Sequence, residues 1–282
     1  MQALVLGAGG MLGHDLVRAA PSGTELHPFS RQQLDITDAP ALAARVSALR
    51  PDVILNAAAY TAVDRAEAET KQAWRVNAEA VGELGRIAAA AGARVVHFST
   101  DYVFDGNASR PYREDSPTDP VNAYGASKLA GEEALGRSGA DWLIVRTQWL
   151  FGVNGKSFPR TMWERARAGL ATKVVTDQTG RPTYSHDVAP AVWKLIDGGV
   201  SGVMHIANDG AATWFDVAAR VFERAGKRDL LTACSTADFP TPARRPRYSV
   251  LDTTRLDKQL GGPLPPWADA VDRFLECLPS RT

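Results

Sequence analysis

Short apolar runs alternate with longer helical patterns through the first half of the chain. The runs predict strands at Leu4–Leu6, Leu26–Phe29, Val53–Asn56, Val95–Ser99 and Leu143–Arg146. The stretches between them predict helices at Met11–Ala20, Ala39–Leu49, Lys71–Ala91 and Ala123–Leu135, the third with a stop at Gly92. Because runs with little polar alternation suit strands buried on both faces, this order predicts βαβ units and a parallel sheet covered by helices.

The second half is less regular, with prolines clustered between residues 240 and 246 and again between 263 and 266. Its helical patterns predict helices at Phe158–Ala168, Asp187–Ile196, Phe215–Ala225 and Trp267–Leu278. The sequence thus predicts an α/β fold with two parts. Residues 1–150 form a Rossmann-type domain with a doubly wound parallel sheet, and residues 151–282 form mainly a smaller α/β substrate-binding lobe. A segment near residues 185–206 is expected to return to the first domain.

Composition narrows the class of protein. The 282 residues are 45% hydrophobic, and 32 Lys+Arg balance 32 Asp+Glu to a formal net charge of zero. A zero balance gives no long-range attraction to nucleic acid or to an anionic membrane. The two distant cysteines, Cys234 and Cys277, form no disulfide framework. With no targeting segment at Met1 and no apolar run long enough to span a bilayer, we expect a soluble, cytoplasmic protein.

A glycine-rich loop follows the first predicted strand and opens the first helix. It reads Gly7-Ala8-Gly9-Gly10-Met11-Leu12-Gly13, with glycines at GxxGxxG spacing. Such glycines allow a tight turn and let the backbone approach a pyrophosphate, which the helix N-terminus then attracts. The alternative is a glycine-rich turn without a ligand, but strand, glycines and helix stand in the required order. Residues 152–157 resemble a P-loop, yet the glycine spacing is too short, so we expect a loop of the second lobe, whose lysine, Lys156, could still meet a phosphate.

Candidate catalytic residues stand near the middle of the chain. Tyr124 and Lys128 are four residues apart on a predicted helix, so their side chains share one face. An ammonium there would lower the pKa of the tyrosine, which could then give a proton to a developing alkoxide. Thr100 ends a buried strand, where side chains face the ligand crevice of a parallel sheet, and is placed to hydrogen-bond a substrate carbonyl. The bland alternative for Tyr-x-x-x-Lys is an exposed helix face.

The end of the second strand bears on the choice of cofactor. In dinucleotide folds an acid at this place accepts a hydrogen bond from the adenosine ribose of NAD. Here the strand ends in Ser30 and Arg31, which can donate to a 2′-phosphate. We therefore predict NADPH, with some use of NADH. The alternative is that Arg31 is a solvated charge and that Asp35 reaches the adenosine.

Several segments together resemble the extended short-chain dehydrogenase/reductases, and among these the dTDP-4-dehydrorhamnose reductases most closely. The resemblance covers nearly the whole chain. Besides the glycine loop and Tyr-x-x-x-Lys, it rests on residues 50–56 (RPDVILN), 57–59 (AAA), 62–67 (AVDRAE), 99–104 (STDYVF), 146–149 (RTQW), 177–183 (DQTGRPT) and 240–246 (PTPARRP). The later segments are more specific than the glycine loop, which all relatives share.

The resemblance implies a reaction in which NADPH gives hydride to C4 of dTDP-4-dehydro-6-deoxy-L-mannose, forming dTDP-L-rhamnose. It implies that Tyr124 supplies the proton, that Lys128 tunes Tyr124 and holds the nicotinamide ribose, and that Thr100 polarises the ketone. The positions that match the family's contacts with the sugar nucleotide are Thr100, Asp101 and Trp149. Those that match its cofactor contacts are Gly7, Gly9, Gly10, Met11, Leu12, Gly13, Ser30, Arg31, Asp35, Ile36, Ala57, Ala58, Ala59, Tyr124 and Lys128. Asn77 matches a helix asparagine that supports the active site.

One departure from the family pattern concerns metal. Some relatives bind magnesium at a dimer interface through glutamates, but residues 182–187 here contain no glutamate. The five histidines show no metal-ligand spacing. We therefore expect no metal site and a monomer or weak homodimer. His97 and His205 lie in apolar strands and are expected to be core histidines with their hydrogen bonds made.

Other functions stay open at this point. Some proteins that resemble this family bind a nicotinamide cofactor without catalysis and serve a partner enzyme as regulatory subunits. A reductase or epimerase acting on another nucleotide sugar would share the same motifs. A dehydratase would be expected to carry an acid pair where Thr100 and Asp101 stand.

Overall fold

The computed structural model describes residues 1–278, and a parallel sheet of six strands lies at its centre. The strand order is β10-β5-β4-β3-β1-β2, and each neighbouring pair runs parallel. The strands are β1 (Gln2–Leu6), β2 (Glu25–Phe29), β3 (Val53–Asn56), β4 (Arg94–Thr100), β5 (Trp142–Thr147) and β10 (Gly202–His205). The predicted parallel sheet and all five strands predicted in the first half are confirmed. The sixth strand, β10, comes from the second half and pairs with β5 at the edge.

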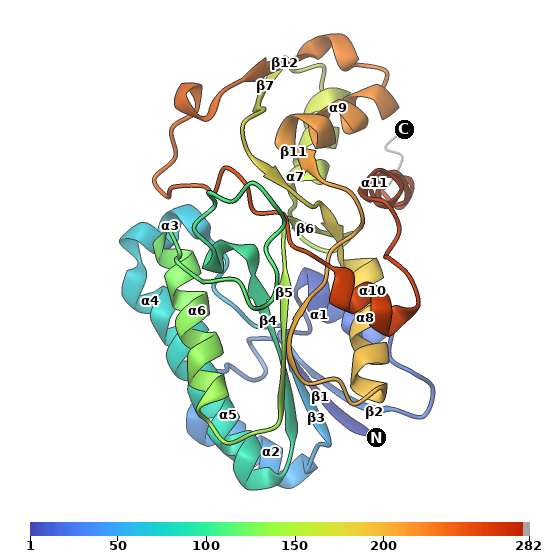
Figure 1. Ribbon diagram of the computed structural model, residues 1–282. Coiled ribbons are helices and arrows are strands. Elements are labelled where there is room, and N and C mark those ends of the chain that lie inside the picture. The colour runs from blue at the N-terminus through green and yellow to red at the C-terminus, as the bar shows by residue number, and fades with distance from the viewer. Residues whose placement is uncertain (279–282) are drawn as a thin grey trace.

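Helices cover both faces of this sheet (Figure 1). One face packs on α1 (Met11–Arg18), α8 (Ser185–Asp197) and α10 (Thr254–Leu260). The other packs on α2 (Ala39–Leu49), α5 (Ala80–Ala91) and α6 (Ala123–Gly136). In β1, Val5 belongs to the first core, whereas Leu4 and Leu6 belong to the second. Both faces of a strand are therefore apolar, which is why the sequence shows short runs without alternation.

The helix predicted at Lys71–Ala91 is not continuous. It consists of α4 (Thr70–Trp74), a π-helical turn η1 (Arg75–Glu79) and α5, which ends at Gly92 in the left-handed conformation with φ 69°. The prediction of one regular helix is wrong, although the stop at Gly92 is confirmed. A π turn adds a residue to the ladder and turns side chains to new directions. A further short helix, α3 (Val63–Ala68), was not predicted.

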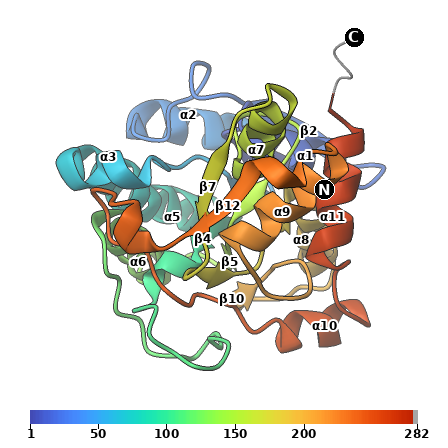
Figure 2. The ribbon, with the colours of Figure 1, turned by 90° about the horizontal axis from the view of Figure 1, so that it is seen from above.

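The smaller lobe lies above the carboxyl ends of the sheet strands (Figures 1 and 2). Its helices are α7 (Phe158–Arg167), α9 (Trp214–Arg224) and α11 (Trp267–Glu276), close to the predicted bounds. Its paired strands are β7 (Thr172–Val175) with β12 (Leu231–Cys234), β6 (Leu150–Phe151) with β9 (Thr183–Tyr184), and β8 (Thr179–Gly180) with β11 (Ala212–Thr213). Short 3-10 turns are η2 (Asp101–Val103), η3 (Arg228–Leu230) and η4 (Thr236–Asp238).

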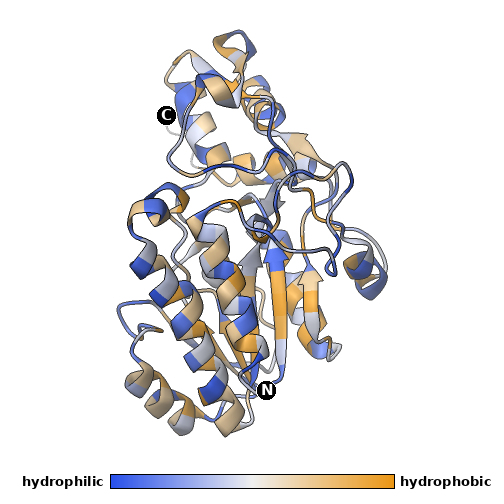
Figure 3. Cartoon of the chain, turned by 60° about the vertical axis from the view of Figure 1, so that its left-hand side comes forward, coloured by the Kyte–Doolittle hydropathy of each residue, from blue (hydrophilic) through white to orange (hydrophobic). Residues whose placement is uncertain are grey.

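The apolar residues of the lobe form a core of their own, in which Phe151, Phe222 and Phe274 are fully buried. Figure 3 shows hydrophobic stretches along strands of the sheet, beside helices that carry both hydrophilic and hydrophobic residues. Over residues 1–278, none of the helices has the length and apolar character that crossing a membrane requires. The lobe core is separate from the two cores of the sheet. A cleft lies at the strand ends, where the loops that carry the predicted site residues meet.

Candidate active site

The glycine loop joins β1 to α1 as predicted. Gly7 has φ 74°, in the region that favours glycine, and its carbonyl accepts a hydrogen bond of 2.9 Å from the Gly10 amide. A Cβ at Gly13 would lie 2.2 Å from the Gly7 oxygen, so only glycine lets α1 begin so close to the strand. The amides at the start of α1 therefore face the cleft without side chains in the way, which suits a pyrophosphate.

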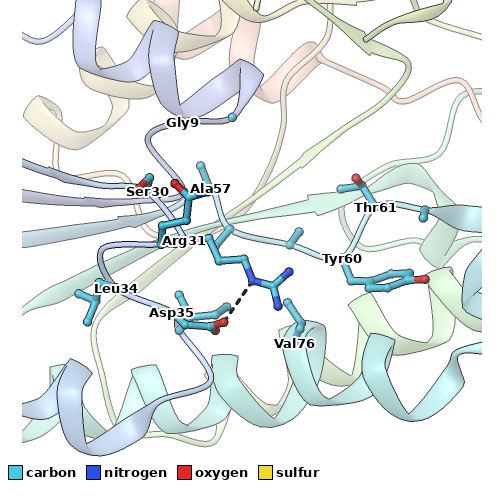
Figure 4. A pocket seen from close by; sticks show the side chains of 16 residues that line it. Gly9, Ser30, Arg31, Leu34, Asp35, Ala57, Tyr60, Thr61 and Val76 are labelled. Carbon is cyan, nitrogen blue, oxygen red and sulfur yellow. Dashed lines mark hydrogen bonds and ion pairs between the residues drawn. The ribbon is translucent and has the colours of Figure 1, made fainter. Parts of the chain in front are cut away.

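A cavity of about 550 Å³ extends from this loop along the ends of β2 and β3 (Figure 4). Its lining includes the predicted residues Gly7, Gly9, Gly10, Ser30, Arg31, Asp35, Ile36, Ala57, Ala58 and Ala59. The lining residues that the sequence did not single out are Gln32, Leu34, Tyr60, Thr61, Ala62 and Val76. They come from loops and from η1, and only the fold brings them together.

Arg31 and Asp35 form an ion pair in this cavity, shown by the dashed line in Figure 4. Arg31 Nε donates to Asp35 Oδ2 at 3.1 Å, and the arginine side chain is 74% exposed. Partial burial raises the pKa of Asp35, but hydrogen bonds from Thr37 and the charge of Arg31 outweigh this and hold the pKa below its usual value. The strand end itself carries no acid, as noted from the sequence, but one helical turn brings Asp35 beside the same arginine.

A second cavity of about 590 Å³ continues from the first and shares Gly10, Ala57, Ala59 and Thr61 with it. It brings together the predicted residues Met11, Leu12, Thr100, Asp101, Tyr124, Lys128 and Trp149. Residues that the sequence reasoning missed here are Val63, Phe98, Ser99, Tyr102, Thr147, Gln148, Leu150, Gly155 and Trp214. Lys156 belongs to the loop between β6 and α7, so the P-loop-like segment lies in the smaller lobe as expected. The two cavities adjoin at their shared residues and form one cleft, and Tyr124 and Lys128 line its second part.

Helix α6 is held in place at its first turn. The side chain of Asn122 caps the helix by accepting from the Gly125 amide at 2.8 Å, and its Nδ2 donates to the Arg244 carbonyl at 2.9 Å. A Cβ at Gly125 would lie 2.1 Å from the Tyr102 oxygen, so the helix packs against η2 through glycine. This contact places Tyr124 beside the carboxyl end of β4.

Thr100 ends β4 and its hydroxyl is fully engaged. It donates to Asp101 Oδ1 at 3.0 Å and accepts from the Tyr102 amide at 3.2 Å. Burial raises the pKa of Asp101 to about 7, a rise that hydrogen bonds only partly offset. A protonated Asp101 can donate to Thr100 instead, which leaves the Thr100 hydroxyl proton for another acceptor. The donor role expected of Thr100 therefore depends on the protonation of its neighbour.

The expected lowering of the Tyr124 pKa is wrong in this structure. Burial raises the pKa of Tyr124 to about 12, and the interaction with the Thr100 side chain only partly offsets this. The Lys128 amine donates to the Phe98 carbonyl at 2.6 Å and lies 3.1 Å from His97 Nε2. Burial also lowers the pKa of Lys128 to about 8. For Tyr124, burial outweighs the lowering of the pKa that a nearby Lys128 ammonium was expected to cause. Burial thus keeps the phenol protonated, which is the form that a proton donor needs.

Asn77 lies in the π turn and links two parts of the cleft. Its amide accepts from the Tyr60 amide at 2.9 Å and donates to the Tyr60 carbonyl at 3.0 Å. It also donates to Ser127 Oγ at 3.0 Å, on the helix that carries Tyr124. The supporting role expected of this residue thus has a structural basis: it ties the loop after β3 to α6.

Trp149 stands where β5 leads into the lobe. Its φ is 45°, an unusual value for a large side chain, and its ring stacks on Trp214 with centroids 3.6 Å apart. A Cβ at Gly180 would lie 2.6 Å from the Trp149 ring. The indole is thus held between a glycine and a second tryptophan at the wall of the cleft, close to Lys156.

Histidines and acids are scattered through the part of the chain that the structure describes. Within residues 1–278, no three His, Cys, Asp or Glu side chains gather into a group that could hold a metal ion. His97 and His205 are fully buried, as expected of core residues. His97 has hydrogen-bond partners on both ring nitrogens, whereas His205 Nε2 has none among the described residues. The expectation of satisfied histidines is thus confirmed for His97 and wrong for the Nε2 atom of His205.

Comparisons with known proteins agree along the whole chain. A family model described as the RmlD substrate binding domain matches residues 1–279. The dTDP-4-dehydrorhamnose reductase of Burkholderia thailandensis is 42% identical, covering 96% of this chain and 97% of that protein. A probable dTDP-4,6-dihydroxy-2-methyloxan-3-one 4-ketoreductase of Streptomyces antibioticus is 41% identical, covering 96% and 93%.

A solved structure is similar over the same length. The crystal structure of dTDP-4-dehydrorhamnose reductase from Bacillus anthracis in complex with NADP has a TM-score of 0.93 and 35% identity, and covers 98% of each chain. Sequence and fold agree with the same group of proteins over both the sheet and the lobe. The chain belongs to the dTDP-4-dehydrorhamnose reductase family.

Proposed function

We propose that this protein is an NADPH-dependent reductase that converts the C4 ketone of dTDP-4-dehydro-6-deoxy-L-mannose into the hydroxyl of dTDP-L-rhamnose. One observation carries the proposal: in a member of this family, the glycine-loop cavity adjoins a second cavity that is lined by Tyr124 and Lys128. A cofactor in the first cavity and a sugar in the second would meet at these side chains.

The first cavity fits a dinucleotide. The cradle has no room for side chains at Gly7 and Gly13 and only tight space at Gly10, and it presents the start of α1, as a pyrophosphate needs. We assign the remaining cofactor contacts to Met11, Leu12, Ser30, Arg31, Asp35, Ile36 and Ala57–Ala59. When bound, NADPH supplies the hydride. Arg31 is the donor that would distinguish NADPH from NADH.

The protein's own residues would supply the proton that the reduced ketone needs. Burial keeps the Tyr124 phenol protonated, so its Oη can hand a proton to the oxygen on C4 as negative charge develops there. Lys128, one turn along α6, holds the cofactor ribose and faces the phenol from the same helix side. Thr100 polarises the carbonyl when Asp101 carries a proton. Each of these roles is a proposal that rests on placement in one cavity.

The lobe would hold the rest of the substrate. Trp149 and Trp214 offer an aromatic wall and Lys156 a cation for the diphosphate. Residues 1–150 would thus bind mainly cofactor, and residues 151–282 mainly the sugar nucleotide. We propose a monomer or weak homodimer that needs no metal and works in the cytoplasm, where reduced Cys234 and Cys277 would be at home.

A second substrate has one observation in its favour. The Streptomyces antibioticus relative, 41% identical, carries the name of a probable reductase for a different dTDP-linked ketone. Both reactions would use the same cofactor and the same proton donor. They differ in the sugar hydroxyls beside the ketone, which the wall around Trp149 would contact.

The test is consumption of NADPH with each purified dTDP-4-ketosugar in turn, with the sugar product identified by NMR. We expect equal amounts of NADPH consumed and dTDP-L-rhamnose formed, and the highest kcat/KM for the L-mannose-derived ketone. A higher kcat/KM for the other ketone would favour the second substrate. Binding of NADPH without turnover of any ketone would point to a non-catalytic regulatory subunit, and conversion without net cofactor use to an epimerase.

A further inference from the structure

A chain of buried polar side chains runs from the sheet to the active-site lysine. His97 on β4 is fully buried between Asn56 of β3 and Lys128 of α6. Its Nδ1 lies 3.1 Å from Asn56 Nδ2, and its Nε2 lies 3.1 Å from Lys128 Nζ. The proposed reaction assigns no role to His97 or to Asn56.

The backbone fixes the direction of the first hydrogen bond. Asn56 Oδ1 accepts from the Ala58 amide at 3.2 Å, so the NH₂ side of the same amide faces His97. Nδ1 of His97 must therefore be the acceptor. Burial and the nearby Lys128 lower the pKa of His97 well below its usual value, so the ring is neutral. A neutral ring that accepts at Nδ1 carries its proton on Nε2.

The proton on Nε2 points at Lys128. An ammonium has only donors, whereas an uncharged amine has one lone pair that can accept. Lys128 also donates to the Phe98 carbonyl at 2.6 Å. Each of these three contacts joins a donor to an acceptor when Lys128 is uncharged. When Lys128 is charged, two donors face each other either at the Lys128–His97 contact or at the His97–Asn56 contact.

We propose that His97 is a positioning residue, which Asn56 fixes as its Nε2–H tautomer and which thereby stabilises the uncharged amine of Lys128. The sequence pattern Tyr-x-x-x-Lys suggests a lasting cation beside the tyrosine. The geometry around His97 points instead to a lysine that both holds and releases a proton near neutral pH.

This property has a use in the reaction, and to that extent the inference rests on the proposed function. Once Tyr124 has given its proton to the alkoxide, a phenolate remains. A proton that leaves Nζ of the Lys128 ammonium and joins Oη of Tyr124 restores the phenol. It leaves an uncharged amine, whose lone pair accepts from His97 Nε2–H. One proton moves, and the charges of both groups are neutralised.

Other titratable groups around Lys128 do not replace His97. Glu132, one turn along α6, favours the ammonium, but its carboxylate is paired at 2.6 Å with Arg146 of β5. Tyr124 precedes Lys128 by one turn, and Asp101 of η2 lines the same cavity. None of these four residues is replaced in the variants below, so their effect on the charge of Lys128 is the same in each variant.

The direct test is the tautomer of His97, read from ¹⁵N NMR of the imidazoles in the full-length protein. The chain has five histidines, and the resonances that vanish in His97→Gln identify this one. We expect a neutral ring protonated at Nε2 from acid to alkaline pH. A ring protonated at Nδ1, or a charged ring at neutral pH, would overturn the proposal whether or not the protein reduces a sugar.

The variant Asn56→Asp is expected to reverse the directions of the hydrogen bonds at His97, with almost no change in the shape of residue 56. Its carboxylate can accept from both the Ala58 amide and His97 Nδ1–H, so the His97 proton moves to Nδ1 and the Nε2 lone pair faces Lys128. The ammonium then has an acceptor. We expect the ratio of charged to uncharged Lys128, followed by ¹³C NMR of labelled lysine, to rise about tenfold or more at a given pH.

A new charge at residue 56 also attracts the Lys128 ammonium directly through space. The Asn56→Asp change is therefore repeated in proteins whose residue 97 is altered. In a His97→Leu background only this direct attraction remains, and the shift should shrink severalfold. In a His97→Gln background, the glutamine amide can rotate so that its NH₂ group faces Asp at residue 56 and its oxygen faces Lys128. The shift in the charge ratio of Lys128 should then return. Equal shifts in all three backgrounds would show that His97 transmits nothing and would refute its positioning role.

Discussion

The indole rings of Trp149 and Trp214 lie face to face, with centroids 3.6 Å apart and planes 8° apart. Trp149 follows the end of β5, and Trp214 begins α9 of the lobe. The Trp214 Nε1–H also donates to Gln178 Oε1 at 3.1 Å. The stack therefore joins the sheet to the lobe at the wall of the cleft, where the sugar nucleotide is proposed to bind.

Replacing Trp149 by alanine should weaken sugar-nucleotide binding alone. A lost aromatic contact of about 0.5–1.5 kcal/mol, plus lost buried area, should raise the KM for the dTDP-sugar by roughly tenfold. The affinity for NADPH, measured by fluorescence titration, should stay nearly unchanged. Trp74→Ala on α4, at an exposed tryptophan outside both cavities, serves as the control. Weakening of both ligands together with a lower Tm would show that Trp149 only packs the lobe.

Removal of the Tyr124 hydroxyl should stop proton supply at the ketone. Tyr124→Phe is expected to lower turnover by about 10²-fold or more, the scale of a lost general acid, while NADPH binding survives. Tyr112→Phe is the matched control, because its hydroxyl bonds to Asp105 within a separate small core. Near-normal turnover of the Tyr124 variant would exclude it as the proton donor.

Arg31 should govern the preference between the two nicotinamide cofactors. A charged contact to the 2′-phosphate contributes about 1–3 kcal/mol, so Arg31→Ala should lower kcat/KM with NADPH by about tenfold or more and leave NADH almost unaffected. The ion pair with Asp35 must open for this contact, which the exposed arginine allows. Arg45→Ala, at an arginine that lies over Phe29 at the end of β2, is the control. An unchanged ratio of the two kcat/KM values would mean that Arg31 does not read the phosphate.

Asp101 should make the stability of the fold fall with rising pH. Its pKa is about 7 in the fold against 3.8 in the unfolded chain, so the folded state binds the extra proton between these values. Stability is therefore lost as pH rises from about 4 to about 7, by at most a few kcal/mol. Asp101→Asn lacks this loss, so its free energy of unfolding relative to the natural protein should increase over that range. A difference that stays flat with pH would contradict the raised pKa.

The buried ion pair between Arg146 and Glu132 should be far more sensitive than a surface pair. Both side chains are 6% exposed and share several hydrogen bonds. Arg146→Met leaves a buried carboxylate alone and should cost about 3–5 kcal/mol in the free energy of unfolding, measured with denaturant. Arg86→Met, which breaks the exposed pair with Glu83, should cost less than about 1 kcal/mol. Equal losses would argue against the burial of the Arg146 pair.

The sequence was informative wherever a pattern was long or local. Strands such as β3 and helices such as α2 were found with their observed bounds, because apolar runs and helical periodicity report burial directly. The glycine loop was found because its turn needs glycine at Gly7 and Gly13. The two-residue strands of the lobe were missed because two residues show no period. The π turn at Arg75–Glu79 was missed because its residues suit an ordinary helix.

Properties that depend on packing were beyond the sequence. Trp214 reaches the cleft only because the lobe folds over the strand ends. No pattern in the sequence linked Trp214 to Trp149, so the stacking of the two rings was not predicted. The direction of the Tyr124 pKa followed burial rather than the charge at Lys128, and burial of a helix face cannot be read from spacing alone. The ion pair of Arg31 with Asp35 was not predicted, because the sequence offered Asp35 only as an alternative contact to the adenosine.

Transfer of deuterium from labelled NADPH tests the proposed hydride transfer to C4 of the sugar most directly. The protein is incubated with dTDP-4-dehydro-6-deoxy-L-mannose and NADPH that carries deuterium in both positions at C4 of the nicotinamide. Mass spectrometry and NMR of the sugar product then locate the label. We expect one deuterium in each molecule of dTDP-L-rhamnose, bound to sugar C4. Product without deuterium at C4, or cofactor binding with no product, would contradict the proposed reduction.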